Sequence, residues 1–388
     1  MTRLKSNIFS AMKIGILCYP TFGGSGVVAT ELGHALSNRG HEIHFITYKQ
    51  PVRLNTLQSN IHFHEVIIPD YPLFKYQPYE LALSSKLVQV VQKEKLELLH
   101  VHYAIPHAYA AYMAQKMLED MGVKIPIVTT LHGTDITLVG SHPFYKDAVA
   151  FSINHSNAVT AVSQSLKDDT LRLFPIKNNI QVVYNFIDAD FYRSRQIPCE
   201  RRLIANKEEK VITHISNFRP LKRILDVIKT FALIQDQCPS KLLMVGDGID
   251  KEKAVSYCKE KGLEDKVVFL GKSNEIDRIL CFSDLFLLPS EQESFGLAAL
   301  EAMIHKVPVI SSNAGGIPEI NKEGYSGYLL EVGDYKGMAE KAVQLLQDPV
   351  AHKKFKAQAF EQALQFDLKK IVGQYESVYQ KAILKKTY

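Results

Sequence analysis

The sequence predicts an α/β fold of two doubly wound, Rossmann-like domains that face each other across a cleft. Short apolar runs alternate with helical patterns along the chain, an order typical of parallel sheets with helices on both faces. The length of 388 residues allows two domains that each bury a core. Residues 188–210 are polar, charged and non-periodic, which indicates a linker. We therefore expect domains over residues 12–190 and 191–367, with strand carboxyl ends lining the cleft.

The first domain is predicted from a strand, a glycine-containing loop and a helix. Residues 13–18 are the apolar strand, residues 19–26 the loop and residues 27–38 the helix. The remaining apolar runs predict strands at residues 42–47, 98–101, 127–130, 158–161 and 181–183.

A second series of strands follows the linker and predicts the second domain. Its apolar runs lie at residues 211–215, 241–245, 267–270, 284–288 and 307–310. Helical periodicity over residues 368–384 predicts a last helix at the end of the chain.

Composition excludes several classes of protein. A hydrophobic content of 46% and a charged content of 22% are typical of a soluble globular protein, and a net charge of +5 is too small for a nucleic-acid-binding footprint. Five widely spaced cysteines without a Cys-x-x-Cys pair favour reduced thiols in a cytoplasmic protein over disulfides or a zinc site. No apolar run approaches the roughly 18 residues that span a bilayer. Residues 1–11 are predicted to be a short disordered extension.

The stretch from Ser290 to Glu301 is the most informative part of the sequence. It follows the apolar strand, so Glu293 should lie in the loop at the strand's carboxyl end and Glu301 about two turns into the next helix. Residues 294–296 would form the helix start, where backbone N–H groups and the helix dipole favour an anion, and Gly296 lets that anion come close. Two carboxylates beside such a helix start suit a nucleotide sugar, although a lone glutamate pair would be read as solvated helix-end acids.

This run resembles the acidic signature of the retaining glycosyltransferases with two Rossmann-like domains (family 4, GT-B fold), which include glycogen and sucrose synthases. The resemblance implies that Glu293 bonds the hydroxyls of the donor sugar and that Glu301 bonds the ribose. It also implies donor contacts along the helix start, from Ser294, Phe295, Gly296 and Leu297.

A basic turn after the first strand of the second domain is a candidate leaving-group site. Arg219 and Lys222 could neutralise a diphosphate as it leaves the sugar, although a solvated basic turn is the ordinary alternative. Most members of the family carry their arginine further upstream, about where Ser216 stands. Whether Arg219 or Asn217 takes over that role is left open by the sequence.

Three further segments resemble donor-side parts of the family. Gly246 belongs to the turn beneath the donor, and Lys272 ends a stretch whose backbone receives the nucleobase in relatives. Gly24 lies in a glycine-rich loop that is a weak signal by itself and does not match Gly-x-Gly-x-x-Gly. No acidic residue follows the second strand, as an NAD ribose would require, so a nicotinamide oxidoreductase is disfavoured.

Histidines dominate the candidate acceptor side. His132 and Asp135 follow a strand and could orient a sugar hydroxyl or assist proton transfer, although a structural histidine is about as consistent with the spacing. In the family, a histidine in this loop contacts the donor sugar near its reacting carbon. His100, His102 and His107 surround another strand end, but no cysteine or carboxylate completes a cluster, so we predict no metal there.

Five motifs resemble one branch of the family, which joins N-acetylglucosamine from UDP-N-acetylglucosamine to the hydroxyl of L-malate in the first step of bacillithiol synthesis. They begin at Tyr19, His102, Thr130, Ser216 and Glu291. The branch implies a metal-independent enzyme without a cofactor, a homodimer, and a helix over residues 368–386 that packs back on the first domain. It implies an acceptor site formed by Ser25, Tyr103 and Thr130, to which Arg53 could add charge.

The sequence also leaves other activities open. A family member could use another sugar, inositol phosphate or a lipid as acceptor, although no exposed basic and apolar helix supports a lipid. An epimerase acting on UDP-N-acetylglucosamine shares the two-domain plan. No carboxylate nucleophile is evident, so the expected reaction is a same-face substitution in which the acceptor proton passes to the departing phosphate.

Overall fold

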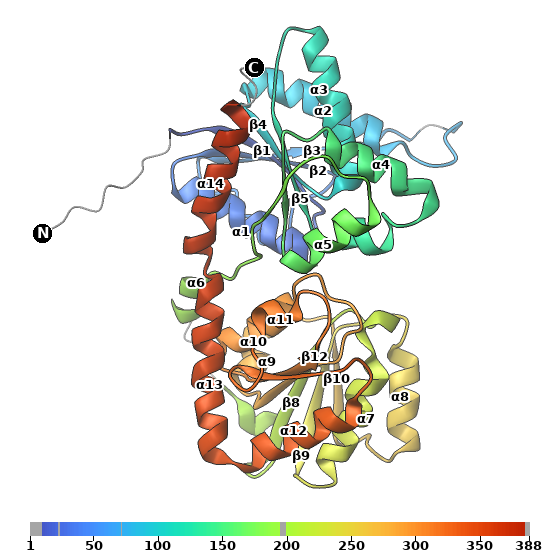
Figure 1. The fold of residues 1–388 in the computed structure, drawn as a ribbon, viewed down its shortest axis with the longest axis vertical. Coiled ribbons are helices and arrows are strands. Elements are labelled where there is room, and N and C mark those ends of the chain that lie inside the picture. Colours follow the sequence, from blue (N-terminus) through green and yellow to red (C-terminus); the bar gives the residue numbers. More distant parts are fainter. Residues whose placement is uncertain (1–9, 22–23, 71, 195–198, 385–388) are drawn as a thin grey trace, which may run out of the picture. The chain divides into compact units, whose positions relative to one another are not determined.

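The computed structural model describes residues 10–21, 24–70, 72–194 and 199–384. The chain forms two compact units, of which unit 1 runs to Asn185 and resumes at Leu368, and unit 2 is Phe186–Asp367 (Figure 1). Both are α/β units built on parallel sheets, which confirms the predicted fold class. The predicted extension over residues 1–11 lies almost wholly outside the described residues.

Unit 1 contains a seven-stranded sheet in the order β3-β2-β1-β4-β5-β6-β7, and every described pair is parallel. Its strands are β1 (Lys13–Leu17), β2 (Glu42–Thr47), β3 (Ile61–Glu65), β4 (Leu98–His102), β5 (Ile127–Leu131), β6 (Ala158–Ala161) and β7 (Ile180–Val182). Its helices are α1 (Gly24–Asn38), α2 (Tyr79–Glu94), α3 (Tyr109–Asp120), α4 (Pro143–Asn154), α5 (Gln164–Leu173) and α14 (Leu368–Leu384).

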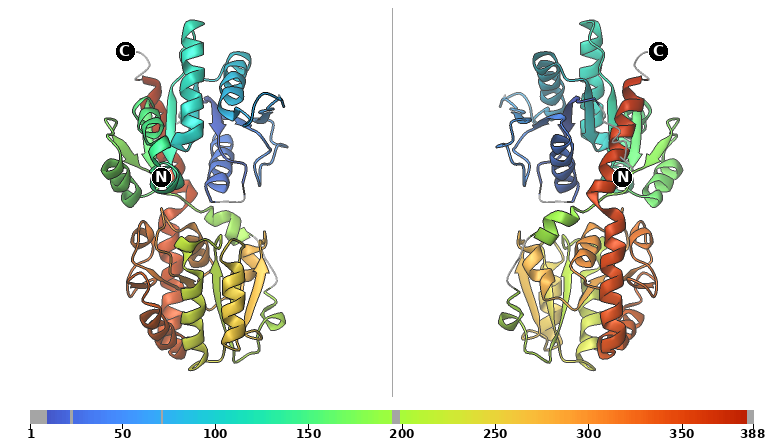
Figure 2. Two further views of the ribbon diagram at one scale, coloured as in Figure 1. Left: turned by 90° about the vertical axis from the view of Figure 1, so that its right-hand side faces the viewer. Right: turned by 90° about the vertical axis from the view of Figure 1, so that its left-hand side faces the viewer.

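The two faces of this sheet are covered by different helices. Leu99 and Val101 of β4 pack with the apolar sides of α2 and α3. The alternate residues His100 and His102 point to the opposite face, because successive strand side chains alternate. Helix α14, red in Figures 1 and 2, packs there on α1, β5 and β6, and the Tyr379 hydroxyl shares a 2.8 Å hydrogen bond with His100 Nδ1.

Unit 2 contains a six-stranded parallel sheet in the order β10-β9-β8-β11-β12-β13. Its strands are β8 (Lys210–Ile215), β9 (Ser240–Val245), β10 (Val267–Gly271), β11 (Leu285–Leu288), β12 (Val309–Ser312) and β13 (Gly327–Leu330). Its helices are α6 (Ala189–Ser194), α7 (Ile224–Gln235), α8 (Lys251–Glu260), α9 (Ile276–Cys281), α10 (Leu297–Ile304), α11 (Ile317–Ile320), α12 (Tyr335–Gln347) and α13 (Pro349–Ala363).

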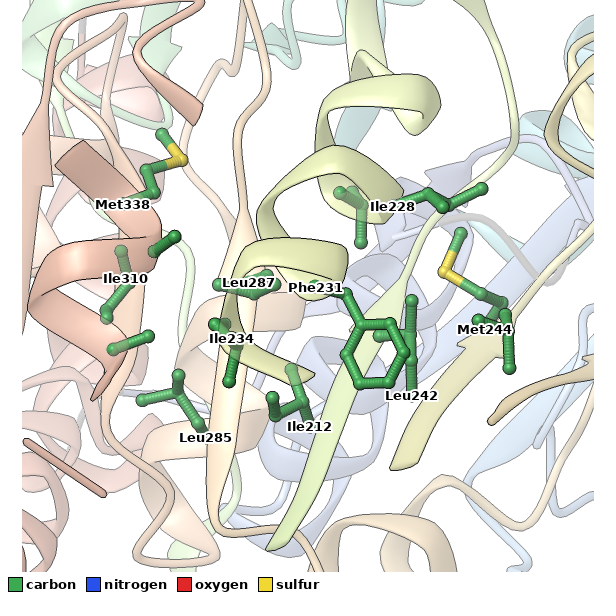
Figure 3. Close-up of a cluster of buried hydrophobic side chains, with 14 of the residues drawn as sticks. Ile212, Ile228, Phe231, Ile234, Leu242, Met244, Leu285, Leu287, Ile310 and Met338 are labelled. Carbon is green, nitrogen blue, oxygen red and sulfur yellow. The ribbon is translucent and has the colours of Figure 1, made fainter. Parts of the chain in front are cut away.

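The larger core of unit 2 lies between this sheet and helices α7, α8 and α12. Phe231 and Ile234 of α7 fill the space above Leu242, Leu285 and their neighbours (Figure 3). A smaller cluster on the other face packs α9 against β8 and β9. Because both faces are covered, the central strands read as continuous apolar runs, which is why they were predictable.

The structure corrects two predictions about the organisation of the chain. Strands β3 and β13 were not predicted, and both are edge strands whose sequences lack a long apolar run. The described part of the supposed linker belongs to unit 2, where Arg201 donates to the Phe282 carbonyl and pairs with Asp284 at 2.7 Å. Arg201 and Glu209 of this polar segment have partners in the fold, so a polar composition did not indicate a linker here.

Each sheet has one point where the strand order reverses, between β1 and β4 in unit 1 and between β8 and β11 in unit 2. In open parallel sheets, loops at the strand carboxyl ends diverge at such points and form ligand sites. Among the described residues, no helix has both the length and the apolar composition needed to cross a membrane.

Candidate active site

Loops at the carboxyl ends of four strands meet in unit 2. The Phe218 N–H donates to the Asp247 carbonyl at 2.9 Å, which joins the loops after β8 and β9. The Glu291 N–H donates to the Leu221 carbonyl at 2.8 Å, which joins the loops after β8 and β11. The Gly316 N–H donates to the Glu293 carbonyl, which joins the loop after β12 to the loop after β11. Asn217, Gly246 and the residues of the acidic run therefore lie on a hydrogen-bonded set of loops at the reversal point, whereas Gly24 belongs to unit 1.

Lys222 and Glu293 form an ion pair at the centre of these loops. Lys222 Nζ contacts Glu293 Oε1, and the Ser290 hydroxyl donates to the same oxygen at 3.1 Å. The Lys222 and Glu293 side chains are only 15% and 14% exposed, so solvent screens the pair weakly. Two residues predicted to be catalytic from separate motifs are thus brought together. Ser290 holds the carboxylate, a role that was not predicted although Ser290 lies inside the acidic run.

Arg219 and Asn217 lie in the same loop and are both exposed. The Lys222 N–H donates to the Arg219 carbonyl at 2.8 Å in a short 3₁₀ turn, so Arg219 begins the turn that Lys222 ends. Ser216, at the position where relatives carry arginine, bonds His214 Nε2 at 2.7 Å. Burial lowers the pKa of His214 to about 4, so this imidazole is neutral.

Gly246 is required by the backbone of the loop after β9. Its φ is +130°, and a Cβ at this position would lie 1.7 Å from the Ser216 carbonyl oxygen. No side chain fits there, because such a contact is far inside van der Waals distance. Lys272 follows β10, two strands away from β8, and is exposed.

The helix start in the acidic run differs from the prediction. Helix α10 begins at Leu297 and is capped by Gly296 at φ +98°, so Glu301 is about one turn into the helix instead of two. The Phe295 side chain is buried and packs edge-on against Phe366 at 5.5 Å. It therefore belongs to the core, and only its backbone remains for a donor. Ser294, Leu297 and Glu301 stay partly exposed beside the cap.

In unit 1, Asp135 organises the loop after β5. Its carboxylate accepts backbone N–H bonds from Ala104 at 2.8 Å, Gly133 at 2.9 Å and His132 at 3.2 Å. Burial raises the pKa of Asp135 to about 6, although these three bonds favour the charged form. Asp135 thereby ties the β5 loop to the loop after β4.

His132 is held as a neutral hydrogen-bonding group. Its Nε2 lies 2.8 Å from Nδ1 of His102, and the residue is 9% exposed. Burial lowers the pKa of His132 to about 3 and that of His102 well below its usual value. So weak a base is poorly suited to proton transfer, which leaves orientation of a hydroxyl as the role that this geometry supports. His102 positions the His132 ring, a role that was not predicted for His102.

Tyr103 and Ser25 are brought together at the reversal point of unit 1. The Tyr103 hydroxyl donates to Ser25 Oγ at 2.7 Å, and Tyr103 has φ +85°, a strained value for a residue with a side chain. Ser25 is the second residue of α1, and exposed Gly24 is the first. Phe22 and Gly23 of the same motif lie outside the described residues.

Two predicted acceptor residues are placed differently. Thr130 is fully buried, and its hydroxyl is 2.7 Å from both His100 Nε2 and Thr160 Oγ1. The Thr130 side chain therefore lies on the sheet face beneath α14, and a contact between Thr130 and the acceptor stays a prediction. Arg53 contacts Glu31 at 2.8 Å and is about one-third exposed, so its charge is shared.

The predicted absence of a metal at the β4 histidines stays a prediction. His100 bonds Thr130 and Tyr379, and His107 Nδ1 lies 2.7 Å from the His102 carbonyl oxygen. Nε2 of His102 and Nε2 of His107 are buried without a hydrogen-bond partner among the described residues.

Comparisons with known proteins agree with this arrangement. The protein-family model of Glycosyltransferase Family 4 matches residues 22–191, and the model of glycosyl transferases group 1 matches residues 200–362. N-acetyl-alpha-D-glucosaminyl L-malate synthase of Bacillus anthracis is 50% identical over 370 residues, covering 95% of this chain and 96% of the relative.

Solved structures share the fold at low identity. Anabaena HepE in complex with UDP and glucose superposes with a TM-score of 0.77 at 22% identity, covering 95% of this chain and 99% of that one. Sucrose-phosphate synthase from Thermosynechococcus elongatus gives a TM-score of 0.76 at 18% identity, covering 96% and 100%.

Proposed function

This chain belongs to the glycosyltransferase family that these two family models define, and we propose that it moves N-acetylglucosamine from UDP-N-acetylglucosamine to the hydroxyl of L-malate with retention of configuration. The similarity to the Bacillus anthracis synthase over nearly the whole chain carries the choice of substrates. The pairing of Lys222 with Glu293 supports the donor site, because it sets a cation and an acceptor of sugar hydroxyl bonds side by side.

The donor is proposed to occupy the loops of unit 2. Glu293 accepts hydrogen bonds from the sugar hydroxyls, and Glu301 accepts them from the ribose. The cap at Gly296 and the first N–H groups of α10 face the diphosphate, where the helix dipole stabilises negative charge. Lys222 then lies between the sugar-binding carboxylate and the phosphate that departs.

The acceptor is proposed to bind unit 1 through Ser25, Tyr103 and the start of α1. Hydroxyl and backbone N–H donors suit a carboxylate, and malate carries two. His132, neutral and held by His102, orients a hydroxyl near the reacting carbon without changing its own charge.

In the proposed step, the malate hydroxyl oxygen forms a bond to the anomeric carbon on the face from which UDP departs. The bond from that carbon to the β-phosphate oxygen breaks, and the hydroxyl proton passes to the phosphate. The protein contributes positioning and stabilisation of the developing charge. Lys222, one basic or amide side chain from the same loop, and the start of α10 supply this stabilisation, so the proposal includes no metal and no cofactor.

Turnover assays across acceptors test the proposal. Release of UDP from UDP-N-acetylglucosamine is measured with a panel of hydroxy acids, sugars and inositol phosphate, with EDTA present, and NMR gives the anomeric configuration of the product. We expect malate to be the preferred acceptor and the product to be the α-anomer. Conversion of UDP-N-acetylglucosamine without any acceptor would instead establish an epimerase, and an inverted product would overturn the same-face mechanism.

A matched pair of glutamates separates the donor role from general charge effects. Glu293→Gln should lower turnover by about 10²–10³-fold, because the sugar loses an oriented acceptor and Lys222 loses its partner. Glu291→Gln, two residues away and exposed, should leave turnover within about twofold. Equal effects of the two substitutions would contradict the assignment.

Arg219→Ala and Asn217→Ala determine which residue assists Lys222. The one that contacts the departing phosphate should lower turnover by about 10²-fold or more with the fold intact. The other should behave as an exposed loop residue. If neither lowers turnover, Lys222 and α10 provide the charge without a second side chain.

A homodimer in the cytoplasm completes the proposal. The five free cysteines suit a reducing compartment, and the dimer rests on the branch resemblance. Sedimentation velocity would reveal a monomer if the dimer is wrong.

A further inference from the structure

A group of metal-ligand side chains lies at the sheet edge of unit 1, away from the residues discussed above. Glu42 and His44 belong to β2, and His62 belongs to the neighbouring edge strand β3, whose position is marked in Figure 1. One ligand atom from each residue lies within 4.8 Å of the other two, which makes this the one such group of three among the described residues. We propose that Glu42, His44 and His62 bind a divalent ion of the zinc class.

The strand register explains why these side chains converge. His44 is paired with His62 in the parallel β2–β3 ladder, and Glu42 lies two residues before His44, so all three project from the same face. The rings of His44 and His62 stack with their centroids 4.6 Å apart. The convergence is thus built into the sheet and does not depend on a flexible loop.

The two distances from the carboxylate to the imidazoles match those of a tetrahedral site. Glu42 Oε1 is 3.2 Å from His44 Nε2 and 3.4 Å from His62 Nε2. Zinc bonds of about 2.0–2.1 Å to nitrogen and oxygen place neighbouring ligand atoms about 3.3 Å apart in a tetrahedron. Two imidazoles and one carboxylate leave the fourth position to water, and the exposed fractions of Glu42 and His62, 31% and 40%, give solvent access.

Contacts with neighbouring residues fix the orientation of two of the ligands, His44 and Glu42. His44 Nδ1 is 2.9 Å from His64 Nε2, so when His44 Nε2 binds the ion, Nδ1–H donates to His64, as a second ligand shell requires. Lys13 contacts the other carboxylate oxygen, Glu42 Oε2, at 3.0 Å, which leaves Oε1 facing the imidazoles. The positive charge of Lys13 also opposes the ion, so affinity is lower than the ligands alone would give.

The site is structural and not part of sugar transfer. Lys13, Glu42 and His62 stand at the amino ends of their strands, whereas Tyr103 and His132 follow the carboxyl ends of theirs. A bound ion would fasten edge strand β3 to β2 across one face of the sheet. Ion binding at this site is independent of the proposed activity.

Titration of tag-free, reduced protein with Zn²⁺ by calorimetry, and with Co²⁺ by visible absorption, tests the site. We expect one ion per chain, the Co²⁺ spectrum of a four-coordinate site and a Zn²⁺-dependent rise in Tm. His62→Gln and Glu42→Gln should each weaken binding by at least about 100-fold, since even outer-shell losses cost 10–100-fold. Turnover should be unchanged in both variants.

Two controls make the test specific. His155→Gln removes an exposed histidine elsewhere in unit 1 and should leave binding unchanged. Lys13→Gln breaks the same ion pair as Glu42→Gln but keeps all three ligands, so it should bind at least as tightly as the natural protein. Absence of Zn²⁺ binding by the natural protein, or equal binding by His62→Gln and His155→Gln, would overturn the proposal.

Discussion

Replacing Lys222 with methionine removes the cation beside Glu293 while keeping a side chain of similar length. In the proposed step, Lys222 faces the phosphate oxygen that gains negative charge as the sugar departs. It is 15% exposed, so water cannot substitute effectively for the lost charge. The substitution therefore tests whether this ion pair is part of the chemistry or only of the fold.

The expected effect on turnover is larger than the effect on folding. Loss of one preorganised donor at a developing oxyanion raises the barrier by about 3–4 kcal/mol, which lowers kcat by about 10²–10³-fold. Folding loses less, about 1–3 kcal/mol, because Glu293 is left partly buried but still accepts the Ser290 hydroxyl bond.

The double variant Lys222→Met with Glu293→Gln separates the two effects. It leaves no unpaired charge, so the free energy of unfolding should return towards that of the natural protein. Turnover should remain low, and the two substitutions should be less than additive because their side chains act as one unit.

The assay measures kcat and KM for UDP release, together with urea unfolding. Lys253→Met is the matched control, because Lys253 pairs with Asp250 on α8 and is 68% exposed. Lys253→Met should change neither the kinetics of UDP release nor the free energy of unfolding appreciably. The reasoning would be refuted by a Lys222→Met enzyme with nearly natural kcat, or by a double variant that recovers turnover along with stability.

Three further substitutions or conditions give equally direct results. Tyr103→Phe removes the hydrogen bond to Ser25 and should raise the acceptor KM by about 3–10-fold with the donor KM unchanged; a change confined to the donor would contradict the acceptor assignment. Gly246→Ala should destabilise the fold by about 3 kcal/mol or more, because its Cβ would lie 1.7 Å from a carbonyl oxygen, whereas Gly262→Ala, also at positive φ but in open space, should cost about 1 kcal/mol in urea unfolding. Lowering the pH from 7.5 to 5 should destabilise unit 1: the pKa of His132 is about 3 in the folded chain and about 6.5 unfolded, so its contribution is present above 6.5 and is lost as the pH falls, by about 2 kcal/mol at pH 5. A flat profile for the natural protein, or the same slope in a His132→Gln variant, would show that His132 is not buried neutral.

The parts of the fold that sequence could predict are those whose residues are constrained on both sides. Central strands of a parallel sheet are buried on two faces, so β9 and β11 appear as apolar runs even without a partner. Edge strand β3 has the sequence IHFHE, in which polar and apolar residues alternate, and no apolar run remains to mark it. One of the two histidines that hid the strand, His62, converges with His44 on Glu42.

For the site, the loops could be located from the sequence, but the direction of each side chain could not. The loops after β8 and β11 were expected to carry donor residues, because strand ends at a reversal point form a site whatever their partners are. A motif match does not say which face of β5 each side chain takes, so the burial of the Thr130 side chain could not be predicted. Phe295 likewise lies beside the cap but turns its ring into the core, which leaves its backbone for the predicted donor contact.

Pairings between distant residues required the structure itself. Lys222 and Glu293 are 71 positions apart, and His100 meets Tyr379 across 279 positions. Topology shows which loops share an edge of the sheet, but the register and the rotamers decide which atoms touch. For His132, the motif allowed two roles, proton transfer or the orientation of a hydroxyl. Only the bond to His102 and the burial of both rings favour orientation, since an imidazole with so low a pKa is a weak base. This agrees with the proposed step, in which the acceptor proton passes to the phosphate.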